Sequence, residues 1–182
     1  AAAVITFFVA VSNADSTAKE YTNSAKTYLD DVYDAAIGTA DSPADILTDI
    51  KKVKAPTLED AFLGDFSDSY KEAKELRVSI NKTVSATTSS IDDIQKFKES
   101  VEQIETYTTS IIKDESALVT ALRNGSESGF KTALDSMVAT CDKLETTVSE
   151  MKKPGDMTAK IDELKTNTVA VCSSIDGIMT AF

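Results

Sequence analysis

The residue types of this chain restrict the chemistry that it can perform. It contains two cysteines, six glycines and no histidine. Without imidazole there is no Ser-His-Asp or Cys-His nucleophile and no histidine metal ligand. The glycines do not form a phosphate-binding loop, because Gly125 and Gly129 are not followed by a lysine. We therefore expect no catalytic residue, no metal site and no cofactor, and we predict that the protein is not an enzyme.

The two cysteines are the strongest chemical candidates. Cys141 and Cys172 lie on two predicted helices that flank a turn at 152–156. In an antiparallel hairpin, residues equidistant from the turn face each other, and Cys172 lies within about one helical turn of the position opposite Cys141. We predict a disulfide between them, which favours an oxidising compartment. Two buried free thiols in a reducing compartment are the alternative.

Carboxylates outnumber the basic side chains. The chain has 30 Asp and Glu against 19 Lys and Arg, a formal net charge of −11. This charge repels phosphate backbones, so we predict no nucleic-acid partner. An acidic run lies between Asp30 and Asp49, and we interpret it as a solvated helix face, with a weak cation site or a docking face for a basic partner as the alternatives.

Four aromatic side chains are candidates for lining a ligand cavity or a partner surface: Tyr21, Tyr28, Phe62 and Phe66. Each falls on the apolar face of a predicted helix. Core packing with the polar tip at the edge explains the same positions. We therefore treat their role in binding as a hypothesis.

The N-terminal segment 1–14 is the most apolar part of the sequence and has no charged side chain. It is too short to span a bilayer, which takes about 20 residues. We interpret it either as the remnant of a secretory signal or as a retained insertion element that packs in its own bundle, in a neighbouring subunit or in lipid. The residues expected to insert or to assemble are Val4, Ile5, Phe7, Phe8 and Val9.

Two sequons are present, at Asn81 and Asn124. Both would accept a glycan in a eukaryotic secretory route. Chance matches are the alternative, because the chain is rich in Ser and Thr.

Two C-terminal helices are predicted by apolar residues that alternate in steps of four and three, the pattern of a narrow helix seam. The seam of the first helix is Phe130, Leu134, Met137, Cys141, Leu144, Val148 and Met151. The seam of the second helix is Ile161, Leu164, Thr168, Val171, Ile175, Ile178 and Phe182.

The N-terminal half of the chain predicts further helices. We expect a helix over 15–37 and a short one that starts at Pro43 and stops before Pro56. A long helix begins at Thr57, where an acid three residues later gives a capping box. The weak helix formers at 86–90 favour a turn, and the alternative is one rod over 58–122.

These features together predict an all-α protein, an antiparallel up-down helical bundle of four to five long helices plus one short helix. Residues 15–182 are expected to form a single domain behind the N-terminal segment. We expect a non-catalytic, secreted or otherwise extracytoplasmic protein that acts as a structural, assembly or protein-interaction subunit, with a protein partner or self-association. The alternative is a carrier that binds a lipid or another hydrophobic ligand between its helices.

Overall fold

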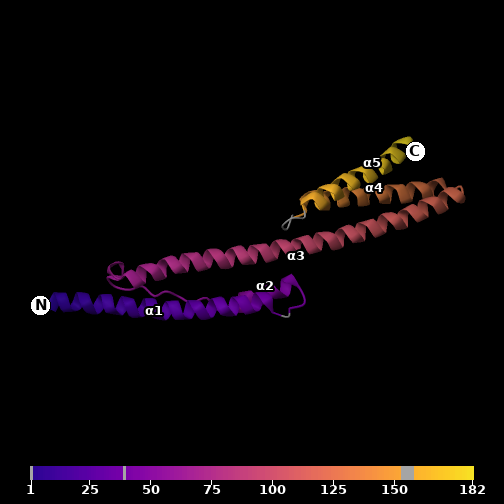
Figure 1. Cartoon of the computed structure of the whole chain (residues 1–182). Helices are drawn as coiled ribbons and strands as arrows, with labels where there is room; N and C mark the ends of the chain where they lie inside the picture. Colours follow the sequence, from indigo (N-terminus) through magenta and orange to yellow (C-terminus); the bar gives the residue numbers. More distant parts are fainter. Residues whose placement is uncertain (1, 39, 153–157) are drawn as a thin grey trace. The chain divides into compact units, whose positions relative to one another are not determined.

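Figure 1 shows the computed structural model, which describes residues 2–38, 40–152 and 158–182. These residues form helices and no strands. The α-helices are α1 (Ala2–Ile37), α2 (Pro43–Lys52), α3 (Asp68–Arg123), α4 (Glu127–Glu150) and α5 (Thr158–Ala181), and a 3-10 helix, η1, spans Gly64–Phe66. The predicted all-α helical bundle is confirmed.

Contacts within the chain divide it into two compact units, an N-terminal unit of residues 1–92 and a C-terminal unit of residues 93–182. Helix α3 runs through both units. The prediction of a single domain over 15–182 stays a prediction, and each unit is described by itself below.

The core of the N-terminal unit forms between α1 and the first turns of α3. Ala14, Ala18, Tyr21 and Ala25 supply the side of α1. They pack with Leu58, Tyr70, Ala73 and Ile80. The three alanines of α1 add little volume, so the tyrosine rings supply much of the side-chain bulk of this core.

The predicted start of α1 at residue 15 is wrong, because the helix begins at Ala2. Segment 1–14 has neither glycine nor proline, so nothing in it interrupts the helix. The predicted end is confirmed, since α1 stops at Ile37, directly before Gly38. The short helix is also confirmed: Ser42 caps it by accepting a hydrogen bond from the Asp45 backbone N–H, and Pro43 is its first residue.

The predicted start of the next helix at Thr57 is wrong as well, because α3 begins at Asp68. The hydroxyl of Ser67 accepts a hydrogen bond from the Tyr70 backbone N–H at 3.1 Å and caps this helix. Leu58 is buried in the core of the unit, so its segment packs as an irregular loop instead of continuing the helix.

The predicted turn at 86–90 is absent, and α3 continues through these residues. Their hydroxyls donate to carbonyls one turn earlier, as Thr87 does to Thr83 at 2.9 Å and Ser90 to Ala86 at 3.0 Å. Such bonds satisfy polar groups that would otherwise compete with the helix, so weak propensity alone did not break it.

The C-terminal unit packs the end of α3 with the hairpin of α4 and α5. The predicted α4 seam is confirmed, with every position from Leu134 to Met151 buried and Phe130 half-buried. On α5 the predicted seam is buried or half-buried at Ile161, Leu164, Thr168 and Ile175, whereas Val171, Ile178 and Phe182 are 49%, 45% and 52% exposed. Cys172 is buried in place of Val171. Of the predicted turn at 152–156, residues 153–156 lie outside the described residues.

Candidate functional site

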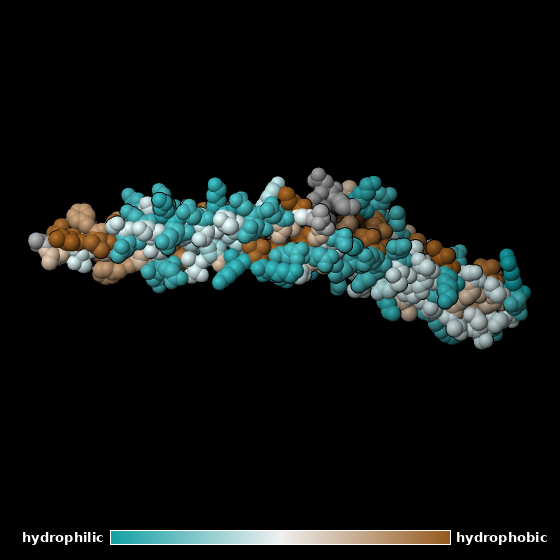
Figure 2. All heavy atoms as spheres, turned by 90° about the horizontal axis from the view of Figure 1, so that it is seen from below, coloured by the Kyte–Doolittle hydropathy of each residue, from teal (hydrophilic) through white to brown (hydrophobic). Residues whose placement is uncertain are grey.

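The most distinctive surface of the N-terminal unit is a group of exposed apolar side chains around the beginning of α1, which we call the apolar tip. Figure 2 shows hydrophobic residues gathered at this end of the helix. The tip consists of Val4, Ile5, Phe7, Phe8 and Val9 of α1 with Phe62 and Phe66 of the following loop and η1. These are the residues for which the sequence predicted insertion or assembly, together with two of the four candidate aromatics.

The α1 part of the tip is strongly exposed. The exposed fractions of Val4, Ile5, Phe8 and Val9 are 56%, 63%, 65% and 53%. At about 100° per residue these four positions fall within about 140° of the helix circumference. The polar side chain in this segment, Thr6, donates its hydroxyl hydrogen to the Ala2 carbonyl at 3.0 Å. The large exposed apolar side chains of α1 therefore lie mainly on one side of the helix.

The two loop phenylalanines join this surface from a different part of the chain. The Phe66 ring meets the Phe7 ring edge-to-face, with ring centroids 5.2 Å apart. Phe62 is 75% exposed and Phe66 is 63% exposed. The contact fixes the loop beside the helix, so the tip combines a helix end with a second aromatic element.

The buried side chain of Tyr70 holds this loop in place. Its ring is buried, and its hydroxyl donates to the Glu59 carbonyl at 2.9 Å while accepting from the Ala61 backbone N–H at 3.2 Å. Gly64 packs directly on the ring, where a Cβ would lie 2.5 Å from the nearest ring carbon. The loop that carries Phe62 and Phe66 is thus fixed by a buried side chain from α3.

A second link joins α1 to the start of α3. The hydroxyl of Ser67 donates to the carboxylate of Asp15, and the same oxygen caps α3. Ser67 is 1% exposed, so this link lies inside the unit. Sequence reasoning missed it, although a serine directly before Asp68 is a common signal for a helix start and could have located the beginning of α3.

Ion pairs lie beside the tip. Lys74 pairs with Asp65 at 2.9 Å and Lys71 with Asp68 at 2.8 Å. The hydrogen bond from Lys74 lowers the pKa of Asp65, and that from Lys71 lowers the pKa of Asp68. Both carboxylates are therefore charged at neutral pH. Both lysines are neutralised, so the tip has no basic patch made from these residues.

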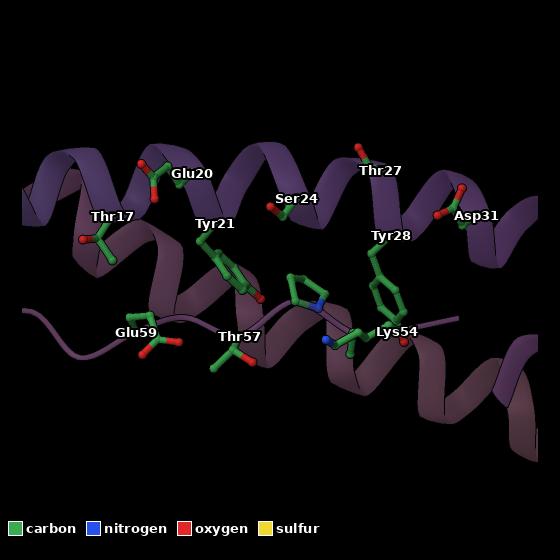
Figure 3. Close-up of a pocket in the computed structure, with 12 residues that line it drawn as sticks. Thr17, Glu20, Tyr21, Ser24, Thr27, Tyr28, Asp31, Lys54, Thr57 and Glu59 are labelled. Carbon is green, nitrogen blue, oxygen red and sulfur yellow. The ribbon is translucent and has the colours of Figure 1, made fainter. Parts of the chain in front are cut away.

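The other two candidate aromatics, Tyr21 and Tyr28, line a groove of about 510 Å³ between α1 and segment 54–59. Figure 3 shows both rings pointing from α1 toward this segment. Most of the remaining lining is polar or charged, including Glu20, Asp31 and Lys54. Burial raises the pKa of Tyr21, which keeps its phenol neutral. The structure thus separates the four aromatics into two pairs, one in the groove and one at the tip.

Cys141 and Cys172 lie together in the core of the C-terminal unit, as the hairpin argument predicted. The structure holds them as free thiols. Burial raises the pKa of both thiols. The disulfide stays a prediction.

The two sequons occupy different settings. Asn81 lies within α3, and Asn124 lies in the turn between α3 and α4, next to Gly125 with its φ of 66°. Both asparagine side chains are exposed. Glycosylation at either position stays a prediction.

Comparison with protein-family models, with curated proteins and with solved structures finds no match for this chain. None of the helices in the described part of the chain combines the length and apolar character needed to cross a membrane. The features of the structure that bear on function are therefore the apolar tip, the groove and the thiol pair.

Proposed function

We propose that this protein is a non-catalytic, extracytoplasmic helical-bundle subunit that acts by attachment, with a structural, assembly or protein-interaction role. The observation that supports this proposal is the apolar tip, where seven large apolar side chains are at least 36% exposed. Isolated exposed apolar residues are ordinary on a protein surface, but a contiguous group from two segments is typical of an interaction site.

The gain from covering the tip is comparable to the cost of association. Fully burying one large apolar side chain stabilises by about 1.5–3 kcal/mol. Since these side chains are already partly covered, their combined gain is on the order of 5–10 kcal/mol. Association costs about 4–15 kcal/mol, so the tip offsets much of that cost by itself.

The cysteine pair supports the extracytoplasmic part of the proposal. Cys141 and Cys172 lie in one buried cluster of α4 and α5, and an oxidising compartment would favour a disulfide between them. We include this disulfide in the proposal for the mature protein.

A carrier function receives less support. The groove beside Tyr21 and Tyr28 is lined mainly by hydroxyls and charged groups. A hydrophobic ligand would bury these polar groups without giving them hydrogen-bond partners, which costs free energy. The geometry therefore favours attachment through the tip over transport of an apolar ligand between the helices.

Removal of residues 1–13 tests the proposal. The buried part of α1 begins at Ala14, so the deletion leaves the core of the N-terminal unit intact. We expect the full chain to self-associate in sedimentation velocity runs and the shortened chain to sediment as a monomer, with helicity lost only for the removed turns. A matched control is Val78→Ser, because Val78 is 65% exposed but lies outside the tip. Unchanged sedimentation of the shortened chain would contradict the proposal.

A further inference from the structure

The exposed apolar side chains of α1 form a stripe that faces away from the core of the N-terminal unit. This α1 stripe consists of Val4, Ile5, Phe8 and Val9. The buried side of the same helix, on which Ala14, Tyr21 and Ala25 lie, is centred roughly 140° from the middle of the stripe. The core of the unit therefore lies on the other side of α1 and leaves the stripe open to a partner.

The stripe is short and carries no charge. Further along the same side of α1 the side chains are Ser12, Asp15 and Lys19, so the apolar surface ends after Val9. A helix that pairs with it needs an apolar stripe of the same short length, and α1 of a second copy carries one. Segment 1–14 is uncharged, so two copies can meet here although each chain has a formal net charge of −11.

We propose that the α1 stripes of two copies of this chain pair in an antiparallel arrangement. This inference rests on the proposed function, because it names the partner that the apolar tip binds. Such a pair is isologous, which means that both copies present the same surface. Antiparallel packing opposes the two helix dipoles and keeps the charged parts of the two α1 helices, from Asp15 onward, at opposite ends of the pair. Parallel packing would place them side by side.

The extent of the stripe sets the register of the pair. An antiparallel pair with matched centres places Val4 of one copy opposite Val9 of the other. Ile5 then lies opposite Phe8. In this register Asp15 lies about 9 Å along the helix axis beyond Val9, the last residue of the contact. The carboxylate of Asp15 therefore stays outside the apolar contact.

The available area is that of a reversible dimer. Each of the seven side chains of the tip leaves on the order of 100 Å² exposed. Two stripes alone then bury about 800 Å², and two whole tips, with Phe62 and Phe66 included, bury about 1,400 Å², whereas stable specific interfaces bury about 1,200–2,000 Å². We therefore expect a dimer that dissociates on dilution.

The test is sedimentation equilibrium of the full chain over a range of concentrations. Val4→Lys places a charge in the stripe and should weaken dimerisation at least tenfold. Thr6→Lys is the matched control and should change it less than threefold, because Thr6 lies about 130° from the middle of the stripe. Circular dichroism of each variant verifies that the helices are retained.

A double variant tests the antiparallel register. Combining Val4→Lys with Val9→Glu brings opposite charges together twice in the antiparallel pair, so we expect it to dimerise at least tenfold more tightly than either single variant. A parallel pair would bring like charges together and would gain nothing from the combination. Failure of the double variant to exceed the single variants would overturn the antiparallel arrangement.

The remaining outcomes separate this inference from the proposed function. Equal losses in Val4→Lys and Thr6→Lys would overturn pairing through one side of the helix. Self-association that disappears on removal of residues 1–13 but persists in Val4→Lys would overturn the inference and leave the proposed function standing, with another part of the tip as the contact. If removal of residues 1–13 leaves sedimentation unchanged, both proposals fail.

Discussion

Gly64→Ala is the sharpest test of how the loop of the apolar tip is held. The added Cβ would lie 2.5 Å and 2.6 Å from two ring carbons of Tyr70, closer than non-bonded carbons can approach. The ring has little freedom to move, because it is 3% exposed and its hydroxyl bonds to Glu59 and Ala61.

The expected loss of stability follows from these contacts. Forcing a methyl group into a packed site costs about 1–3 kcal/mol. If the ring moves away instead, its two hydrogen bonds weaken, at about 0.5–1.5 kcal/mol each. By either route we expect Gly64→Ala to lower the free energy of unfolding by about 1–3 kcal/mol, a sizeable share of the ~5–15 kcal/mol that is usual for a domain.

Gly177→Ala is the matched control, because it is the same chemical change in open space. Gly177 lies inside α5, and a Cβ there meets no atom within 4 Å. Alanine restricts the unfolded chain more than glycine does, so we expect a gain of about 0.5–1 kcal/mol.

Urea denaturation followed by far-UV circular dichroism measures both variants. The chain has no tryptophan, and four of its five tyrosines lie in the N-terminal unit, so near-UV signals report mainly on that unit. If Gly64→Ala unfolds at the same urea concentration as the parent chain, the contact with Tyr70 does not hold the loop as described. If Gly177→Ala destabilises the protein as much as Gly64→Ala does, the effect does not come from the Tyr70 contact.

Three further predictions concern single contacts. Tyr70→Phe leaves the Ala61 N–H and the facing carbonyl without their partner, and we expect a loss of about 1–3 kcal/mol in urea denaturation. Ser126→Ala removes the hydroxyl that caps α4 and should cost about 1 kcal/mol, whereas Ser126→Asp should retain most of the stability. Burial raises the pKa of Cys141 and Cys172 above 9.0, so the folded state favours neutral thiols. We expect their contribution to the free energy of unfolding to be fully present below pH 9 and to be lost as the pH rises above it. The double Cys→Ala variant should lose this part of the pH dependence.

The repetition of apolar residues determined most of the helices from sequence alone. The α4 seam was predicted at every position because a step of four and three is a local property of the helix. The absence of histidine and the apolar N-terminal segment were equally visible, and they directed attention to attachment instead of catalysis.

Other features depended on side-chain contacts that helix propensity does not describe. The start of α3 at Asp68 instead of Thr57 follows from the burial of Leu58 and from the bonds that Tyr70 makes to the loop. The continuation through 86–90 follows from hydroxyls that bond within the helix. A local propensity scale contains none of these contacts, so it placed both boundaries wrongly.

The candidate site also has features that the sequence determines and features that only the packing decides. Sequence alone determined that Phe7, Phe8, Phe62 and Phe66 are apolar and that segment 1–14 carries no charge. Only the tertiary structure decided that Phe66 meets Phe7, while Tyr21 faces a polar groove. The physical reason is that a side chain's chemistry belongs to its own residue, whereas its neighbours are set by the packing of segments far apart in the chain.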